Sequence, residues 1–497
     1  MTCRTSRRDF MKSAGVAALA AAAPGRTARA ESARAARKRN ILFILIDDLR
    51  YDGLSILNPY FRTPHLDALA QDGILFDRAF VTTSLCSPSR ASILTGQYAH
   101  VHGVLDNSTL LPADTPTFPQ ELQRAGYRTG FAGKWHMGGS TDAPQPGFDR
   151  WVSFRGQGVY YNPTFNIDGE QEKREGYVTD LITDYADEFI RASKDGPFML
   201  YMSHKAVHGD FYPAERHKDS YAGKKFTRPA SMADSEENYR GKPAWVRAQR
   251  QSWHGVDGMY NKHTDFDTFT EDYAETLLAV DDSVGRIVDT LKELGLLDST
   301  LIFFTSDNGF QFGEHGLIDK RTMYETSIRV PLIAHCPELF KGGQRRKEMI
   351  LNIDFAPTML EAGGVAIPDS VQGESFYGLL TGERTEWRDA WLYEYFWERS
   401  FPQTPSVLGV RTDRYKLMQY HGVWDRYELY DLDNDPDEMD NLLADFMIEN
   451  EGGTLDGLIA RTAEGEIKGL FNDLRGRLDA MLKQYRCAAE PNWHPWT

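Results

Sequence analysis

Cys86 lies in a short segment whose residue types could carry out nucleophilic chemistry. The segment reads Cys86-Ser87-Pro88-Ser89-Arg90. Because Ser-Pro is typical of a helix start, we expect residue 86 at or just before a helix N-terminus, where free N–H groups and the dipole favour negative charge. A thiol placed there has a lowered pKa, which is the ordinary route to a reactive cysteine. By position alone, a buried cysteine that merely precedes a helix fits equally well.

Oxygen-bearing side chains follow two apolar runs that are typical of buried strands. Asp47 and Asp48 follow residues 41–46, and Asp307 and Asn308 follow a second run. Ligands of open α/β sheets bind beyond the carboxyl ends of strands. Three carboxylates and an amide oxygen suit calcium or magnesium rather than zinc, and calcium tolerates irregular geometry. We therefore expect one calcium ion, with magnesium as the alternative, although an Asp-Asp pair alone is more often a cap or loop feature.

Cationic and imidazole side chains follow two further expected strands. Lys134 and His136 come at the end of one, and His204 and His208 follow the run 198–203. A lone histidine is more often a structural residue than a ligand. Polar groups at four strand ends are a more specific pattern, because parallel strands bring such ends to one edge.

The segment around residue 86, with the Thr95-Gly96 ending of the next helix, closely resembles the signature of type I sulfatases of the alkaline phosphatase superfamily. A second segment, GYRTGFAGKWH at residues 126–136, matches the same family. The resemblance covers about residues 40–442. In that family a formylglycine-generating enzyme oxidises this cysteine to formylglycine, so the resemblance implies that the nucleophile is residue 86 after oxidation and not a thiol.

The resemblance also implies a role for each candidate residue. It implies that the metal is bound by Asp47, Asp48, Asp307, Asn308 and the modified Cys86. Arg90 and Lys134 would stabilise the formylglycine hydrate, and His136 would accept a proton from it. His208 and Lys320 would bind the sulfate and protonate the leaving oxygen. His204 and His315 either face the substrate or support a neighbour.

These roles form one coherent mechanism. One hydroxyl of an aldehyde hydrate, polarised by the metal, attacks sulfur and displaces the alcohol; the other, once deprotonated, expels sulfate. Lys134, Lys320 and Arg90 neutralise the charge of the transferring group. His208 would supply a proton near neutral pH.

Two alternatives to a sulfatase remain open at this point. A phosphonate monoester or phosphodiester hydrolase of the same superfamily would share the fold and metal, but residues 279–286 and 305–310 resemble bacterial glycan sulfatases, especially N-acetylglucosamine-6-sulfatases. A sulfated-glycan-binding protein with a dead site would have lost Cys86, Lys134 or a metal acid, and all are present. We therefore expect a sulfated saccharide as the substrate, with N-acetylglucosamine 6-sulfate as a candidate.

Strand and helix patterns that alternate along the chain predict the fold that positions these residues. Residues 39–381 are expected to form a large α/β domain, alkaline-phosphatase-like, with a mostly parallel sheet flanked by helices. Residues 382–497 are expected to form a smaller α+β domain with an antiparallel sheet. Expected strands are 41–46, 129–135, 198–203, 301–306, 330–334, 391–397, 407–420 and 427–432; expected helices begin at Thr63-Pro64 and cover 270–294 and 467–482. The polar stretch 217–261 is expected to be a surface excursion near the site.

The first 30 residues have the pattern of an export signal. Arg7-Arg8 precede an apolar run, and Ala28-Arg29-Ala30 offers a cleavage site. The segment closely resembles a twin-arginine (Tat) signal, with a basic tail as the alternative, so we expect Tat export to the periplasm or medium. No later segment reaches the roughly 18 apolar residues of a membrane helix, and no membrane span is expected.

Charge and cysteine content limit the partners. Residues 1–30 carry six basic and one acidic side chain, so their removal takes the net charge from −16 to −21. A chain this acidic argues against nucleic acid as a partner, and an anionic substrate must meet a local cation cluster. Cys336 is expected in the core, and the pairing of Cys487 is left open; three cysteines after Cys3 do not make a disulfide framework.

Overall fold

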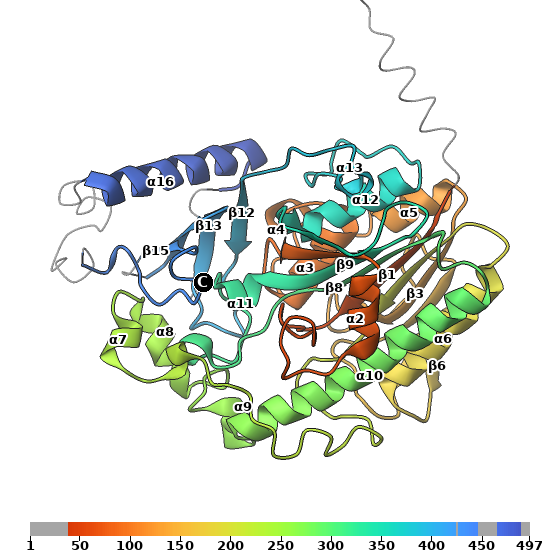
Figure 1. The fold of residues 1–497 in the computed structure, drawn as a ribbon, viewed down its shortest axis with the longest axis horizontal. Helices are drawn as coiled ribbons and strands as arrows, with labels where there is room; N and C mark the ends of the chain where they lie inside the picture. Colours follow the sequence, from red (N-terminus) through yellow and green to blue (C-terminus); the bar gives the residue numbers. More distant parts are fainter. Residues whose placement is uncertain (1–37, 424–425, 446–464, 489–497) are drawn as a thin grey trace, which may run out of the picture. The chain divides into compact units, whose positions relative to one another are not determined.

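The structure, a computed structural model, describes residues 38–423, 426–445 and 465–488, and contains two β-sheets with their covering helices (Figure 1). The expected export signal, residues 1–30, lies outside these ranges. Within them, no helix is both long enough and apolar enough to cross a membrane.

The larger sheet has 11 strands and contains the predicted parallel core. Its strands are β1 (Asn40–Ile46), β2 (Ile74–Phe80), β3 (Arg128–Lys134), β4 (Arg150–Phe154), β5 (Thr164–Ile167), β6 (Glu170–Lys173), β7 (Phe198–Ser203), β8 (Thr300–Ser306), β9 (Arg329–His335), β10 (Gln344–Arg346) and β11 (Ile350–Leu351). They follow the order β10-β2-β9-β8-β1-β7-β3-β4-β5-β6, with β11 beside β2. The five strands from β8 to β4 in this order all run parallel. The expected α/β class is confirmed.

Helices cover both faces of this sheet, which explains why its central strands are continuously apolar. In β1, Leu42 and Ile44 pack on one side while Phe43 and Leu45 pack on the other. The first side is covered by α2 (Pro64–Gln71), α6 (Val178–Ser193) and α10 (Phe266–Glu293), and the second by α3 (Cys86–Thr95), α5 (Phe118–Arg124) and α12 (Phe355–Ala362) (Figure 1). Shorter helices are α4 (Ala99–His102), α7 (Glu236–Tyr239), α8 (Ala244–Ala248), α9 (Met259–Lys262), α11 (Glu325–Ile328) and α13 (Tyr377–Thr381).

Most predicted elements are present, with informative differences. The strand expected at 330–334 is β9, but it runs antiparallel to both β8 and β2. The long helix starts at Asp265, whose carboxylate accepts the N–H groups of Asp267 and Thr268. Thr63 precedes α2 as expected, but its side chain does not cap the helix. The stretch 217–261 contains three short helices and pairs at Gly255 with Leu317, which places it beside the Lys320 segment.

The second sheet is antiparallel and four-stranded, as predicted. It consists of β12 (Ala390–Tyr395), β13 (Ser406–Thr412), β14 (Tyr415–His421) and β15 (Tyr427–Asp431), and α16 (Gly465–Tyr485) packs on it. The run 407–420, expected as one strand, is two strands joined by a tight turn. The described residues from Arg39 onward form one compact unit. The boundary proposed between residues 381 and 382 falls between α13 and β12.

Gly133 provides a test of how closely β3 and β7 approach. Its φ is +123°, and a Cβ added there would clash with the carbonyl oxygen of Ser203. We expect Gly133→Ala to lower the free energy of unfolding by about 3 kcal/mol or more. Gly139, where an added Cβ meets nothing within 4 Å, is the matched control. Denaturant unfolding of both variants measures the effect, and equal losses would contradict this reading of the strand pair.

Candidate active site

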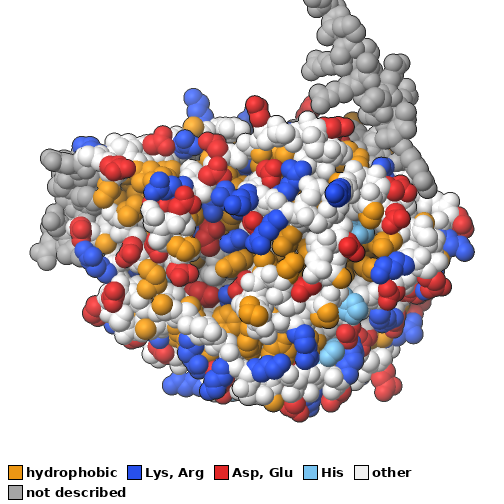
Figure 2. Space-filling model, viewed as in Figure 1, with side chains coloured by type: hydrophobic (Ala, Val, Ile, Leu, Met, Phe, Trp, Pro, Cys, Tyr) orange, Lys and Arg blue, Asp and Glu red, His pale blue; other side chains and the backbone are white. Residues whose placement is uncertain are grey.

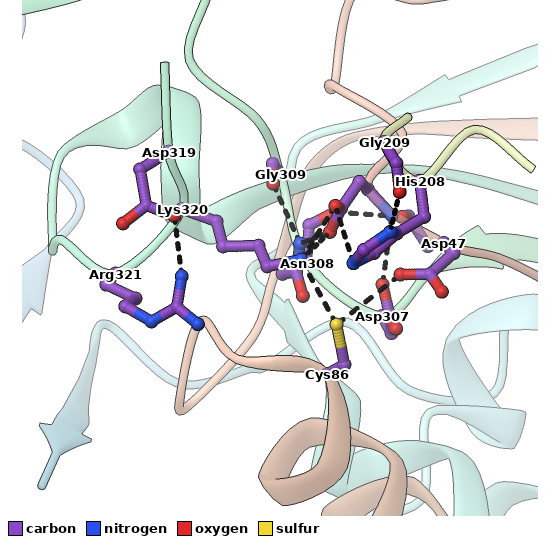
Figure 3. Close-up of polar contacts among 12 residues, drawn as sticks. Asp47, Cys86, His208, Gly209, Asp307, Asn308, Gly309, Asp319, Lys320 and Arg321 are labelled. Carbon is purple, nitrogen blue, oxygen red and sulfur yellow. Dashed lines mark hydrogen bonds and ion pairs between the residues drawn. The ribbon is translucent and has the colours of Figure 1, made fainter. Parts of the chain in front are cut away.

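The parallel strands β8, β1, β7 and β3 lie side by side, so their carboxyl ends meet at one edge of the sheet. Ile46 pairs with Ser306, while Leu45 and Gly133 both pair with Ser203. Most of the polar residues predicted at these strand ends are therefore brought together, with His204 as the exception. The close-up in Figure 3 shows this edge, with Cys86 facing the cluster from α3.

Three carboxylates form the centre of the cluster. Asp47, Asp48 and Asp307 are almost wholly buried, and an oxygen of each lies within 4.8 Å of the others. Burial, reinforced by the charge of Asp47, raises the pKa of Asp307. Burial also raises the pKa of Asp48. Asp47 is different, because Lys134 and other cations outweigh its burial and hold its pKa well below the usual range.

Arg90 neutralises two of these carboxylates from α3. Its Nε donates to Asp307 at 2.8 Å, and its Nη2 lies 3.5 Å from Asp47. Its Nη1 donates at 2.7 Å both to the carbonyl oxygen of Lys134 and to Ser203 Oγ. The guanidinium therefore ties α3 to the ends of β3, β7 and β8.

Two lysines complete the set of cations. The Lys134 ammonium contacts Asp47 and donates to Gln157 Oε1 at 2.5 Å. The Lys320 ammonium donates to both oxygens of Asp48, at 2.5 and 2.6 Å. Figure 3 shows the Lys320 side chain reaching the cluster from the side opposite His208. Three buried acids thus face three buried bases.

Cys86 is the first residue of α3, as predicted, but the electrostatics of its thiol are not those expected. Its Sγ lies 3.4 Å from Asp47 Oδ1 and 3.1 Å from Lys320 Nζ. The prediction of a lowered pKa is wrong: burial and the Asp47 carboxylate raise the pKa of the thiol well above its ordinary value. Desolvation outweighs the helix terminus here. The unmodified side chain is therefore a protonated thiol and a poor nucleophile.

Two predicted histidines lie at the edge of the cluster. The Nδ1 of His136 is 3.5 Å from Ser87 Oγ, and the Nε2 of His208 is 3.8 Å from Asp48. The pKa of each imidazole is well below its ordinary value. Burial and the charge of Lys134 lower the pKa of His136, and burial with the charges of Lys134 and Lys320 lowers the pKa of His208. His208 Nδ1 faces the carbonyl oxygen of Gly209 at 2.6 Å. That nitrogen therefore carries the hydrogen in the neutral ring, and Nε2 is unprotonated.

Two other histidines lie away from the cluster. His204 Nε2 contacts Ser283 of α10 at 3.2 Å. His315, expected as a substrate ligand, has its ring 3.9 Å from that of Tyr324, and its carbonyl oxygen accepts the Tyr239 hydroxyl. Among the described residues, His315 therefore belongs to the contact with the second sheet rather than to the group around Cys86.

Several residues that position the cluster were not recognised in the sequence. Ser203 and Gln157 hold Arg90 and Lys134. Around Lys320, His254 lies 3.5 Å from Asp319, and Arg321 donates to Asp319 and to Glu398 at 2.8 and 2.7 Å. Ser203 could have been found, because it directly precedes the strand-end histidine His204. Gln157 and Glu398 lie in no motif.

The donor set fits a divalent cation. Within the described part of the chain, the Asn308 side chain donates to Asp48 and Gly309, yet its buried Oδ1 has no hydrogen-bond partner. An orphaned buried oxygen is costly and marks a position where a partner is missing. It lies beside three carboxylates, which are the ligand type of calcium and magnesium.

Comparison with known proteins identifies the class. Residues 39–365 match the family model described as Sulfatase, and residues 313–460 match that described as N-sulphoglucosamine sulphohydrolase, C-terminal. An N-acetylglucosamine-6-O-sulfatase of Bacteroides thetaiotaomicron is 34% identical over 470 residues, covering 82% of this chain and 83% of the relative. The chain belongs to the sulfatase family. It is a sulfuric ester hydrolase.

Solved structures agree with this assignment. One, described as a complex with its substrate D-glucosamine-2-N,6-O-disulfate, has a TM-score of 0.79 and 31% identity, covering 91% of this chain and 99% of that one. A phosphonate monoester hydrolase from Silicibacter pomeroyi has a TM-score of 0.69 and 26% identity, covering 90% and 95%. The fold is thus shared across both activities and does not by itself separate them.

Removing Arg90 tests whether the buried carboxylates depend on it. We expect Arg90→Ala to cost about 3–5 kcal/mol of unfolding free energy, because Asp307 would stay buried without its partner. The control is Arg78→Ala, which breaks a solvent-exposed pair with Asp413 and should cost at most about 1 kcal/mol. Both are measured by denaturant unfolding, and a loss for Arg90→Ala no larger than the control would refute the assignment.

Proposed function

We propose that the chain removes a sulfate ester from an amino sugar of a sulfated glycan, with N-acetylglucosamine 6-sulfate as the favoured candidate. Support for the sugar comes from the name of the 34% identical relative and from the disulfated glucosamine described for the structural neighbour. The observation that carries the proposal is the position of Cys86, whose sulfur lies between Asp47 and Lys320 in a ring of buried charges.

The balance of charges supports an anionic substrate. Three carboxylates and three cationic side chains cancel one another in the cluster. A divalent cation bound there would leave a net charge of about +2, which is complementary to a sulfate group in a buried setting. The cluster is thus the local positive site that an acidic protein needs in order to bind sulfate.

We assign the cation to Asp47, Asp48, Asp307 and Asn308, with the modified residue 86 as a further ligand. Calcium is favoured over magnesium because the donors come from two strand ends and a helix start and need not form an octahedron. Such an ion polarises a hydroxyl nucleophile and neutralises the oxygens of the sulfate.

Residue 86 is assigned as formylglycine, produced by a formylglycine-generating enzyme. Its aldehyde hydrate supplies two hydroxyl groups on one carbon, one as nucleophile and one for expelling sulfate. Arg90 and Lys134 are placed to stabilise negative charge near this residue. His136, neutral and close to Ser87, is placed to accept a proton.

Lys320 and His208 approach the cluster from opposite sides, and we assign them to the sulfate oxygens. The sequence analysis gave the leaving-group proton to both. Since the neutral His208 ring has its hydrogen on Nδ1, toward Gly209, Lys320 is the better source. Although burial acts against it, Asp48 and the other nearby negative groups hold the pKa of Lys320 well above its ordinary value, so it is a protonated ammonium.

Residues 1–30 are proposed to direct Tat export, with the periplasm or medium as destination. The support is the Arg7-Arg8 pair, the apolar run and the small-residue site in the sequence. The Tat route carries folded proteins, which is compatible with oxidation of Cys86 in the cytoplasm before export.

Replacement of Cys86 tests the nucleophile. We expect Cys86→Ala to lower turnover of 4-nitrophenyl sulfate about 10³-fold or more. Cys336→Ala removes a second buried thiol, one that contacts only the Asp298 carbonyl in the hydrogen bonds described, and should change turnover little. Mass spectrometry of the wild-type Cys86 peptide should show a loss of about 18 Da relative to the thiol. Full activity in Cys86→Ala, or an unmodified thiol in active enzyme, would refute the proposal.

Removal of calcium tests the metal assignment without relying on activity. In the purified wild-type enzyme we expect chelation to lower the thermal midpoint, since an ion at 100 times its Kd stabilises by about 2.7 kcal/mol. Re-addition of calcium should restore the thermal midpoint of the wild type. It should also restore that of the control variant Asp413→Asn, which changes an exposed carboxylate, but not that of Asp48→Asn. A midpoint that does not respond to chelation or calcium would count against the site.

A further inference from the structure

A pocket of about 420 Å³ lies next to the cluster and is not used by the proposed chemistry. Its size is within the range of small-molecule sites. Residues that line it include Asp210, Tyr212, Trp253, Tyr260 and Asp272. Its walls come from the segment after β7, the stretch 217–261 and the start of α10.

Two connections fix this pocket beside the reacting groups. On one wall, Asp210 follows His208 by two residues, which is at most about 7 Å of extended chain. The hydroxyl of Tyr260 lies beside the intervening glycine, since a Cβ added at Gly209 would be 3.2 Å from it. Burial and the charge of Asp48 raise the pKa of that hydroxyl. The wall of the pocket formed by Asp210 and Tyr260 therefore adjoins the chain segment that carries His208.

The second connection runs through Trp253. The neighbouring His254 lies 3.5 Å from Asp319, and its carbonyl oxygen accepts the N–H of Ile318 at 2.8 Å. Trp253 itself packs edge-on against Tyr260, with ring centroids 4.5 Å apart. The indole is thus held near the segment that contains Lys320. The two walls of the pocket are therefore connected to the chain segments of His208 and Lys320, the two groups assigned to sulfate.

The chemistry of the lining indicates what it binds. Trp253 is 41% exposed and Tyr212 is 56% exposed, so both lining residues offer accessible aromatic surface. Aromatic faces beside a few polar groups are typical of pockets that stack on the C–H face of a sugar. Among the described lining residues two are acidic, Asp210 and Asp272, and none is Lys or Arg. The charge of the pocket lining is therefore negative, whereas the groups assigned to sulfate in the cluster around Cys86 include cations.

We infer that this pocket is a second saccharide subsite, which binds an uncharged sugar ring adjoining the sulfated one and disfavours a ring that carries a carboxylate or a second sulfate. The inference rests on the proposed sulfatase function. With such a subsite, the enzyme would desulfate glycans in which a sulfated amino sugar alternates with a neutral hexose. Trp253 and Tyr212 supply stacking surface, and Asp210 and Asp272 supply the charge discrimination.

Figure 2 shows one face of the molecule, on which acidic and basic side chains are interspersed with hydrophobic ones. The acidic side chains of the pocket lining are Asp210 and Asp272, whereas Lys320 belongs to the cluster around Cys86, outside this lining. A substrate with one anionic group and one neutral ring matches that polarity.

The test compares three substrates with the purified enzyme: 6-sulfated N-acetylglucosamine, the same sugar joined to galactose, and the same sugar joined to glucuronate. We expect kcat/KM for the galactose disaccharide to exceed that for the glucuronate disaccharide about tenfold or more, one tenfold step being 1.4 kcal/mol. Asp210→Asn and Asp272→Asn should narrow this ratio. A preference for glucuronate, or a ratio that both variants leave unchanged, would overturn the inference.

Trp253→Ala tests the stacking surface. The ratio of kcat/KM for the galactose disaccharide to that for the monosaccharide should fall about tenfold. Trp387→Ala is the matched control, because this tryptophan donates to the Met349 carbonyl oxygen away from the pocket, and it should leave the ratio unchanged. An equal loss on both substrates in Trp253→Ala would mean a structural role only and would overturn the inference.

A binding measurement separates failure of the subsite from failure of the proposed function. Calorimetric titration of the wild-type enzyme with the unsulfated galactose disaccharide should show binding that weakens about tenfold in Trp253→Ala. Binding of this kind in an enzyme that desulfates none of the three sugars would sustain the subsite and refute the sugar sulfatase proposal. No difference between wild type and variant would refute the subsite.

Discussion

Three buried carboxylates at the ends of β1 and β8 are the constraint on which the rest of the structure depends. Charges removed from water in this way are tolerated only when paired and hydrogen-bonded. Arg90 from α3 and Lys134 from β3 meet this need, so neither the helix nor the strand can move independently of the acids. Because α3 begins at Cys86, the same pairing that stabilises the acids sets the position of Cys86, the proposed nucleophile.

The second sheet contributes to the site through Lys320. Its loop is fixed by Arg321, which donates to Asp319 and to Glu398, a residue just beyond β12. Arg321 also lies 3.6 Å from the centre of the Phe401 ring. An ion pair at the surface would add little stability, but the pairs of Arg321 with Asp319 and Glu398 are buried and multiply hydrogen-bonded. The C-terminal part of the chain therefore helps to hold the segment that contains Lys320, the proposed proton donor.

The sequence predicts what local pattern determines and misses what tertiary contacts determine. The apolar run of β1 and the acids after it were read correctly, because a strand buried on both faces has no other composition. The strands β5 and β6 were not recognised, since Glu170–Lys173 is polar and largely exposed. The pKa of Cys86 was predicted in the wrong direction: a helix start is visible in sequence, but full burial beside Asp47 is not. The position of His315 beside Tyr324 likewise depends on tertiary contacts that no local pattern shows.

Short-range interactions, rather than the net charge of the protein, govern how this enzyme distinguishes charged substrate groups. The chain has a net charge of −16, and its surface as a whole repels sulfated glycans. At physiological ionic strength the Debye length is about 8 Å, so exposed charges farther away are largely screened. Lys134, Lys320 and Arg90 are buried and escape that screening, so in the proposed function they would act on a sulfate at contact distance. Since Asp210 lies only two residues from His208, it would act within a similarly short range on the next ring in the proposed subsite. Affinity for one sulfate and rejection of a neighbouring anion are then compatible in adjacent sites.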